Sequence, residues 1–401
     1  MLCPVRTSKA FRFRVYPTPA QVVRLDAWES ALRFLWNLAL QQRLLGLARP
    51  RDERRFPTAF DQINELTELR AALSWLADVP RNVCSQLLVE LDRAWQRCFK
   101  RLARAPRWKR KGLDSLAFCE PHPKVWRLNG ANVRFPKLGN LRAVLHRPLE
   151  GKPKTCTLKR DGDQWFVSIV CEVEIVAPAP RLGPVVAIDR GIANFGATSD
   201  GEMIANPRHL EAALRQLARA QRTVSRRKKG FKNREKAKLR VARIHRKVRR
   251  QREHFLHVLS HDLAKSHGVV VLEKLNVAGM MKGNCARSIA SASWSKFAEM
   301  LRYKLAWSGG TLVEVPAAYS SQTCSACGCV DAASRRSQSA FVCTSCDHHD
   351  HADLNAAKVL LGRANRSASM PVEGTGSSRP LRSGKRVELR VPRRSLESSA
   401  L

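Results

Sequence analysis

The stretch CSACGCVDAASRRSQSAFVCTSCDHHDHADLNAA, residues 324–357, decides how the C-terminal part of this chain folds. It holds two C-x-x-C pairs, Cys324 with Cys327 and Cys343 with Cys346, separated by fifteen residues. This spacing is typical of a zinc ribbon, in which four thiolates surround Zn²⁺ as a tetrahedron. The alternative is a pair of disulfides, which needs an oxidising compartment, and residues 1–16 contain no apolar run typical of a signal peptide. We therefore expect a structural zinc site.

The charge of the chain predicts a polyanionic partner. Its 401 residues include 72 Lys and Arg against 34 Asp and Glu, a net charge of +38, which is far more than solubility requires. The length allows two or more domains. No apolar stretch approaches the roughly 18 residues of a membrane-spanning helix, and the basic residues are spread along the chain. Nucleic acid is therefore favoured over a membrane.

The N-terminal part combines one strand signal with several helix signals. Residues 11–15 alternate apolar and basic side chains, as in a half-buried strand. Thr18 is a good N-cap for a long amphipathic helix. Residues 58–70 and 80–105 repeat the helical periodicity, and a proline follows the second of them. We therefore predict a helical module at residues 18–106.

The middle of the chain predicts a β-rich domain. Asn129-Gly130 and Asp161-Gly162 are hairpin-turn signals between residues of alternating polarity. Residues 115–176 therefore predict an antiparallel barrel or sandwich, of which the strand at residues 11–15 is a candidate member. A basic run precedes this region and suits either phosphate contacts with base stacking or a solvated loop. That run consists of Arg107, Trp108, Lys109, Arg110 and Lys111.

Three acids are placed as a two-metal nuclease requires. The apolar strand 185–188 ends on Asp189, and the apolar strand 269–272 ends on Glu273. Asp353 opens a short helix rich in Ala and Leu. Each acid alone fits a solvated terminus, but carboxylates from adjacent strand ends and one helix can together hold two Mg²⁺ ions about 4 Å apart.

A basic helical hairpin is expected between these two strands, at residues 207–265. From residue 226 to residue 252 there are fifteen Lys and Arg against one acid, Glu235. A solvated helical surface would mix charge signs, so this region predicts contact with a nucleic-acid backbone. The candidate contacts are Arg226, Arg227, Lys228, Lys229, Lys232, Arg246, Lys247, Arg249 and Arg250.

The C-terminal segments complete the organisation. Ser293 is expected to cap a helix that ends at Gly309-Gly310. Residues 311–315 predict another buried strand, which leads into the ribbon. From residue 364 the chain is rich in Ser, Arg, Pro and Gly, so we expect a disordered tail at residues 364–401.

Five motifs together resemble the TnpB family of bacterial insertion sequences, which is related to the type V CRISPR effectors. The resemblance covers roughly residues 9–361. The motifs are KAFRFRVYPT at 9–18, AIDRGIAN at 187–194, VLEKLNV at 271–277, TCSACG at 323–328 and DLNAA at 353–357.

The resemblance implies a multidomain α+β protein with an RNase H-like (RuvC) nuclease domain. Asp189, Glu273 and Asp353 would be its metal-binding acids. The implied domains are a wedge-like β-barrel at 1–17 and 107–178, a helical recognition lobe at 18–106, the nuclease at 181–319 and 348–363, and an inserted zinc ribbon at 320–347.

The family implies an RNA-guided DNA endonuclease encoded by a transposable element. Its partners would be a guide RNA from the element end and double-stranded target DNA, with no membrane and no small-molecule substrate. Its cofactors would be structural Zn²⁺ and catalytic Mg²⁺, with Mn²⁺ as a substitute. We expect it in the bacterial cytoplasm, associated with the nucleoid.

Two points stay open at the level of sequence. The family usually has an acid-Arg pair directly before its third catalytic Asp, whereas this chain has His351-Ala352, so Asp350 rivals Asp353 as the third ligand. We prefer Asp353 because it directly precedes the Leu-Asn-Ala-Ala helix. The alternative functions are a transposase that acts without guide RNA and a nuclease-inactive regulator of transposition.

Overall fold

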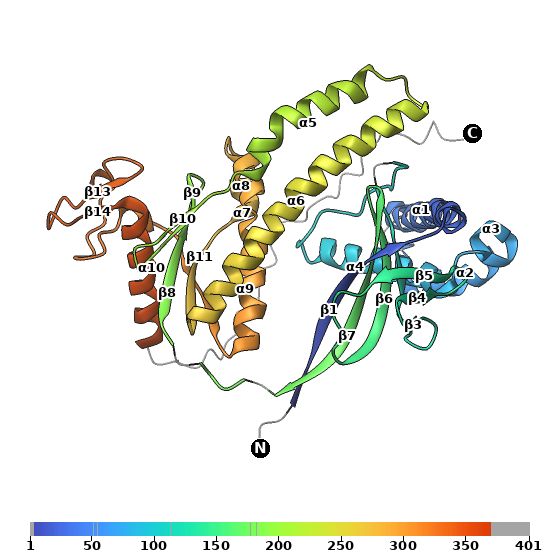
Figure 1. Cartoon of the computed structure of the whole chain (residues 1–401), viewed down its shortest axis with the longest axis horizontal. Helices are drawn as coiled ribbons and strands as arrows, with labels where there is room; N and C mark the ends of the chain where they lie inside the picture. The colour runs from blue at the N-terminus through green and yellow to red at the C-terminus, as the bar shows by residue number, and fades with distance from the viewer. Residues whose placement is uncertain are drawn as a thin grey trace.

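Two β-sheets, one in each half of the chain, form the framework of the protein. The computed structural model describes residues 4–50, 52–53, 55–112, 114–176, 178–181 and 183–369. Figure 1 shows the N-terminal sheet with its helices on one side, the C-terminal sheet on the other, and a long helical hairpin rising between them.

The N-terminal sheet has seven antiparallel strands in the order β2-β6-β7-β1-β5-β4-β3. Phe11, Phe13 and Val15 of β1 are buried, which confirms the alternation in the sequence. The hydrogen-bonded order has two ends, β2 and β3, in the described part of the chain, and the wedge-like barrel stays a prediction. The strands are β1 (Pro4–Tyr16), β2 (Ala117–Glu120), β3 (Arg127–Asn129), β4 (Asn132–Phe135), β5 (Gly139–Val144), β6 (Lys152–Asp161) and β7 (Gln164–Val176).

Four helices pack on this sheet and share its core. Thr18 caps α1 as predicted and forms a capping box with Gln21. Thr58 forms the same kind of capping box with Asp61 at the start of α2. Trp28 packs beside Phe118 of β2, with 6.0 Å between ring centroids. The helices are α1 (Pro19–Ala48), α2 (Ala59–Ala72), α3 (Ser74–Ala77) and α4 (Arg81–Phe99).

The helix predicted at residues 80–105 is shorter than expected. It ends at Phe99, because Arg101 adopts a φ of 57°, a left-handed conformation that a right-handed helix cannot continue. The proline at 106 therefore lies in a loop beyond the helix end.

The C-terminal sheet has five strands in the order β10-β9-β8-β11-β12. β8, β11 and β12 are parallel, whereas β9 and β10 run antiparallel as a meander. The strands are β8 (Val185–Arg190), β9 (Asn194–Thr198), β10 (Met203–Ala205), β11 (Val269–Lys274) and β12 (Thr311–Pro316).

Helices cover both faces of this sheet. Val186 and Ile188 point to the face that packs against α6 and α9, while Ala187 points to the face that packs against α10. Figure 1 shows α10 on one side of β8 and α9 on the other. The helices are α5 (His209–Arg226), α6 (Lys232–Ser266), α7 (Val277–Met280), α8 (Ala286–Ala292), α9 (Trp294–Ser308) and α10 (Ala352–Ser369).

Three C-terminal predictions need correction. Ser293 precedes α9, but its hydroxyl donates to the Ala290 carbonyl at 3.0 Å instead of capping the helix, because the residue has a φ of 55°. β12 is an edge strand in which only Val315 is buried. α10 continues to Ser369, since Leu360 and Ala364 still pack on the sheet, so the expected tail cannot begin at 364. The rest of that tail, 370–401, lies outside the described residues.

Candidate nuclease site

Strand alternation brings the first two acids to one face of the C-terminal sheet. Ile188 of β8 is paired with Leu272 of β11 in parallel register. The next residue in each strand is an acid, Asp189 in β8 and Glu273 in β11. Asp189 and Glu273 therefore share the face that also carries Ala187, which is the face covered by α10. Asp353 lies in the first turn of α10, at the same face.

Asp189 lies within electrostatic reach of the other two acids, although the carboxylate oxygens of the three do not all come within 4.8 Å of one another. Burial, the charge of Glu273 and the charge of Asp353 raise the pKa of Asp189 from 3.8 to about 8, against the opposing charges of Arg335 and Arg190. Burial also raises the pKa of Glu273. Perturbed carboxyl groups of this kind are a mark of functional sites.

Arg190 fixes the position of Glu273. The Arg190 backbone N–H donates to Oε1 of Glu273 at 3.2 Å, and its side chain donates to the Glu273 carbonyl oxygen. The Arg190 Nε atom lies 3.7 Å from the same Oε1. Because both side chains are buried, this contact ties the ends of β8 and β11 together beside Asp189.

The rival acid Asp350 is engaged elsewhere. It lies in β14 (His349–His351), where its Oδ2 accepts from Lys358 at 2.7 Å and its Oδ1 accepts from the His351 backbone N–H at 2.8 Å. Asp350 is not among the charges that shift the pKa of Asp189, whereas Asp353 is. Asp350 is thus paired with Lys358, while Asp353 lies in the first turn of α10, and the choice of Asp353 as the third acid stays a prediction.

The four ribbon cysteines form a closed metal-binding cluster. Among the described residues they are the one group of three or more His, Cys, Asp or Glu whose ligand atoms all lie within 4.8 Å of one another. The Sγ atoms of Cys324 and Cys346 are 3.7 Å apart, and those of Cys327 and Cys343 are 3.6 Å apart. A tetrahedron with Zn–S bonds of about 2.3 Å has edges of about 3.8 Å, so the donors fit Zn²⁺.

Arg335 connects the ribbon to the acids, and sequence reasoning missed it. Its Nη2 atom lies 3.2 Å from Oδ1 of Asp353. It follows the short helix η2 (Ala332–Ser334) and precedes β13 (Ala340–Val342), which pairs with β14. A single arginine in a polar loop carries no periodic signal, so only the fold reveals this contact.

The basic run 107–111 is docked by its backbone. The carbonyl of Arg107 accepts from Trp36 at 3.1 Å, and the backbone of Lys109 exchanges two bonds with the Asn37 amide at 2.9 and 3.1 Å. Trp108, Arg110 and Lys111 remain exposed. The surface that these three residues present suits a nucleic-acid strand, and this role stays a prediction.

The basic hairpin divides into an exposed tip and a paired middle. Arg226, Arg227, Lys228, Lys229 and Lys232 are exposed at the turn, where Gly230 has a φ of 88°, and Lys247 is exposed on α6. In contrast, Arg246 is buried and lies 2.6 Å from Asp163, Arg249 pairs with Asp161, and Arg250 donates to Gln164 at 2.8 Å. Arg250 is nevertheless exposed and Arg249 is half-buried, and the nucleic-acid contact predicted for these three residues stays a prediction. Charge sign in a sequence does not reveal the carboxylate partners of Arg246 and Arg249, which lie 83 and 88 residues away.

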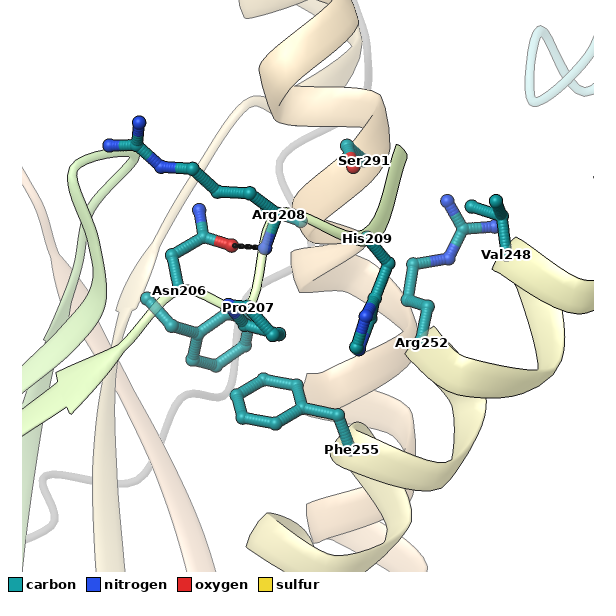
Figure 2. Close-up of a pocket in the computed structure, with 10 residues that line it drawn as sticks. Asn206, Pro207, Arg208, His209, Val248, Arg252, Phe255 and Ser291 are labelled. Carbon is teal, nitrogen blue, oxygen red and sulfur yellow. Dashed lines mark hydrogen bonds between the residues drawn. The ribbon is translucent and has the colours of Figure 1, made fainter. Parts of the chain in front are cut away.

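A small pocket lies apart from the acids, at the start of α5. Figure 2 shows Asn206, Pro207 and Arg208 above the ring of Phe255, with His209 beside Arg252. The Arg208 backbone N–H donates to Asn206 Oδ1 at 3.2 Å. The space measures about 10 Å³, which is about one water molecule, so it holds no substrate.

The chain matches models of three protein regions. They are described as "Probable transposase" at residues 168–284, "Cas12f1-like, TNB domain" at residues 294–360 and "Helix-turn-helix domain" at residues 5–44. In the structure the last of these regions comprises β1 and most of α1.

Two curated relatives match nearly the whole chain. A Streptomyces pristinaespiralis protein named "Putative RNA-guided DNA endonuclease" is 35% identical, covering 95% of this chain and 94% of its own length. An Escherichia coli K12 protein, "Putative RNA-guided DNA endonuclease InsQ", is 30% identical, covering 93% and 96%. The chain belongs to the TnpB family.

One solved structure resembles this chain in its fold. "Cryo-EM structure of the Cas12f1-sgRNA-target DNA complex" aligns with a TM-score of 0.52 over 89% of this chain and 98% of that one, at 13% identity. This similarity concerns the fold alone.

In the described part of the chain, no helix is both long and apolar enough to cross a membrane.

Proposed function

We propose that this TnpB-family chain is an RNA-guided, Mg²⁺-dependent DNA endonuclease encoded by a transposable element. The single observation that carries the chemistry is the placement of Asp189 and Glu273 on one sheet face, under the helix whose first turn carries Asp353. Three carboxylates at one place repel one another, and a divalent cation relieves that repulsion. The RNA guidance follows from the names of the relatives and the net charge of +38.

The strand order supports a RuvC-type nuclease domain. An antiparallel meander β10-β9-β8 continues into parallel β11 and β12, and the acids lie on the two central strands and on the helix that covers them. Carboxylate oxygens are the hard donors that Mg²⁺ prefers. Mg²⁺ bound there would activate water and neutralise charge on the phosphodiester. Mn²⁺ accepts the same donors.

The residues of the chain itself have distinct roles in this proposal. Asp189, Glu273 and Asp353 hold the cations, and Arg190 keeps Glu273 in place. Arg335 lies at the edge of the site, where its guanidinium can contact a non-bridging phosphate oxygen. The four ribbon cysteines would hold a structural Zn²⁺ ion, and the folded ribbon would keep the loop that carries Arg335 in place.

The test is reconstitution with and without RNA. The protein is expressed with the element-end RNA, the RNA that copurifies is sequenced, and a DNA duplex matching its guide segment is supplied with Mg²⁺. We expect cleavage that ribonuclease abolishes and that a scrambled guide segment does not support. RNA-free protein that cuts a defined DNA site equally well would point to a self-sufficient transposase. RNA and DNA binding without any cleavage would point to a nuclease-inactive regulator.

A further inference from the structure

The tip of the β6–β7 hairpin rests on the basic helix α6. Asp161, Gly162 and Asp163, here called the acidic tip, lie between the two strands, and Gly162 has a φ of 64°. A Cβ atom at Gly162 would lie 3.1 Å from Nη1 of Arg246 and 3.7 Å from Cβ of Ala242. The tip therefore touches α6 directly, beside the point where Figure 1 shows α6 passing the ends of β6 and β7.

Cations outnumber acids at this contact. Asp163 lies 2.6 Å from Arg246 and 2.9 Å from Arg243. Asp161 pairs with Arg249 and lies 3.7 Å from Arg12 of β1. A fifth guanidinium, that of Arg250, lies 5.5 Å from the centroid of the Phe166 ring. The guanidinium of Arg12 lies 4.2 Å from the same ring centroid. Five guanidinium groups thus share two carboxylates.

The local potential at this contact is strongly positive. Against the opposing effect of partial desolvation, hydrogen bonds to Arg246 and Arg243 lower the pKa of Asp163 to about 2. Burial and the charges of Arg246, Arg12 and Arg249 lower the pKa of Arg250. The excess positive charge attracts an additional anion.

The ion pairs of the acidic tip are exchangeable. The side chains of Arg243 and Arg249 are 61% and 41% exposed while paired. Ion pairs with such exposure contribute little to stability. A phosphate diester presents the same charge and the same acceptor geometry to a guanidinium as a carboxylate does.

We propose that the acidic tip occupies a phosphate-binding surface of α6 in the nucleic-acid-free protein, and that the phosphate backbone of the guide RNA displaces it. The surface consists of Arg243, Arg246, Arg249 and Arg250. Until RNA binds, the acidic tip therefore covers this surface and holds α6 beside the N-terminal sheet. This inference rests on the proposed function for the identity of the polyanion.

The first experiment removes the competing charges. In the double variant Asp161→Asn, Asp163→Asn, binding of the copurifying RNA, resynthesised with a fluorescent label, is measured by anisotropy over a series of KCl concentrations. We expect binding about 3- to 10-fold tighter than wild type, because two weak ion pairs no longer oppose it. The slope of log affinity against log salt should stay the same, because the same phosphates are bound in the end.

A matched control carries the same change of charge on the same sheet. Glu172 and Glu174 of β7 are also two residues apart and lie away from α6. Glu172 pairs with Lys154 of β6, and Glu174 pairs with Arg6 of β1. The variant Glu172→Gln, Glu174→Gln should change affinity by less than about 2-fold. Unchanged affinity in the tip variant would overturn the proposal. A slope of log affinity against log salt that is steeper in the tip variant than in wild type, by about 0.7 per added phosphate, would also overturn it. The variant would then bind phosphates that wild type does not, which means that the wild-type tip remains on α6 in the complex.

The second experiment locks the tip in place. The Cβ separation at Gly162 and Ala242 lies within the range of about 3.5–4.5 Å found in disulfides. In the variant Gly162→Cys, Ala242→Cys we expect the oxidised form to bind the RNA at least about 10-fold more weakly than the reduced form, which corresponds to about 1.4 kcal/mol. The single variant Gly162→Cys, oxidised in the same way, is the control.

Equal binding by the locked and reduced forms would refute displacement. Neither readout involves cleavage. RNA binding that follows these expectations without guided DNA cutting would therefore count against the proposed function alone, and guided cutting with no effect of the tip would count against this inference alone.

Discussion

The guanidinium of Arg335, in the zinc ribbon, lies 3.2 Å from the carboxylate of Asp353, at the start of α10. This contact brings the ribbon to the edge of the proposed nuclease site. The charge of Arg335 also opposes the rise in the pKa of Asp189, so its influence reaches the acids on the sheet.

Arg335→Ala should therefore slow DNA cleavage. We expect a loss of about 10²-fold in kcat, because a guanidinium that faces the reacting phosphate stabilises charge in the transition state. Zinc content and RNA binding should be unchanged, and Arg335→Lys should recover part of the rate. The neighbouring exposed Arg336 is the control, since Arg336→Ala should cleave normally. Equal rates for the Arg335 and Arg336 variants would remove Arg335 from the site.

Asp353 and Asp350 should separate clearly in cleavage assays. Asp353→Ala should abolish cleavage, as should Asp189→Ala and Glu273→Ala, because each removes a metal ligand. RNA and DNA binding should survive in all three. Asp350→Ala should retain cleavage, because that carboxylate is bound to Lys358. Activity in the Asp353 variant together with loss in the Asp350 variant would reverse the assignment.

The positions of the acids in the fold could be predicted because strand ends and helix starts have local signatures. Asp189 and Glu273 each follow four apolar residues, and the pairing of their two strands brings them to one sheet face. Their role as metal ligands, and that of Asp353, stays a prediction. The clustering of the four cysteines could likewise be predicted, from their spacing alone.

Features that depend on distant partners were not accessible in this way. Arg246 and Lys247 are adjacent and equally basic in sequence, but one is buried on Asp163 and the other is exposed. The early end of α4 depends on the left-handed backbone of Arg101, a residue type that gives no warning of it. The contact of Arg335 with Asp353 likewise depends on how the ribbon folds back on α10.

Zinc removal should unfold the ribbon and cleavage should be lost with it. Cys343→Ser should release about one equivalent of Zn²⁺, because a three-thiolate site binds the ion far more weakly. Hydrogen exchange in the ribbon should rise as the loop that carries Arg335 loosens. Cys329→Ser is the control, since Cys329 lies in the ribbon but outside the four-cysteine cluster. Elemental analysis that finds no zinc in fresh wild-type protein would contradict the structural role.

The stability of the Mg²⁺-free protein should fall as pH rises. The pKa of Asp189 is about 8 in the folded protein against an ordinary value of 3.8, so the folded state holds a proton that the unfolded state releases. The contribution of this proton to the free energy of unfolding is complete below about pH 4 and is lost as pH rises through about 8. Melting curves without added Mg²⁺, with Zn²⁺ retained on the ribbon, should show this decline for wild type relative to Asp189→Asn. Added Mg²⁺ should offset it, because the cation replaces the proton. Parallel pH profiles for the two proteins would contradict the raised pKa.

The exposed tip of the α5–α6 hairpin should bind RNA phosphates without supporting the fold. Lys228 and Lys229 lie at the turn and are exposed, so replacing both by Ala should leave the melting temperature unchanged. RNA affinity should fall, and the slope of log affinity against log salt should flatten by about 0.7 for each phosphate that the lysines no longer neutralise. Arg246→Ala should behave in the opposite way and lower the melting temperature, because it leaves Asp163 without its closest cation. If the two lysines can be removed with no change in the salt slope, the hairpin tip does not contact the RNA, and the nucleic acid lies along the middle of α6 alone.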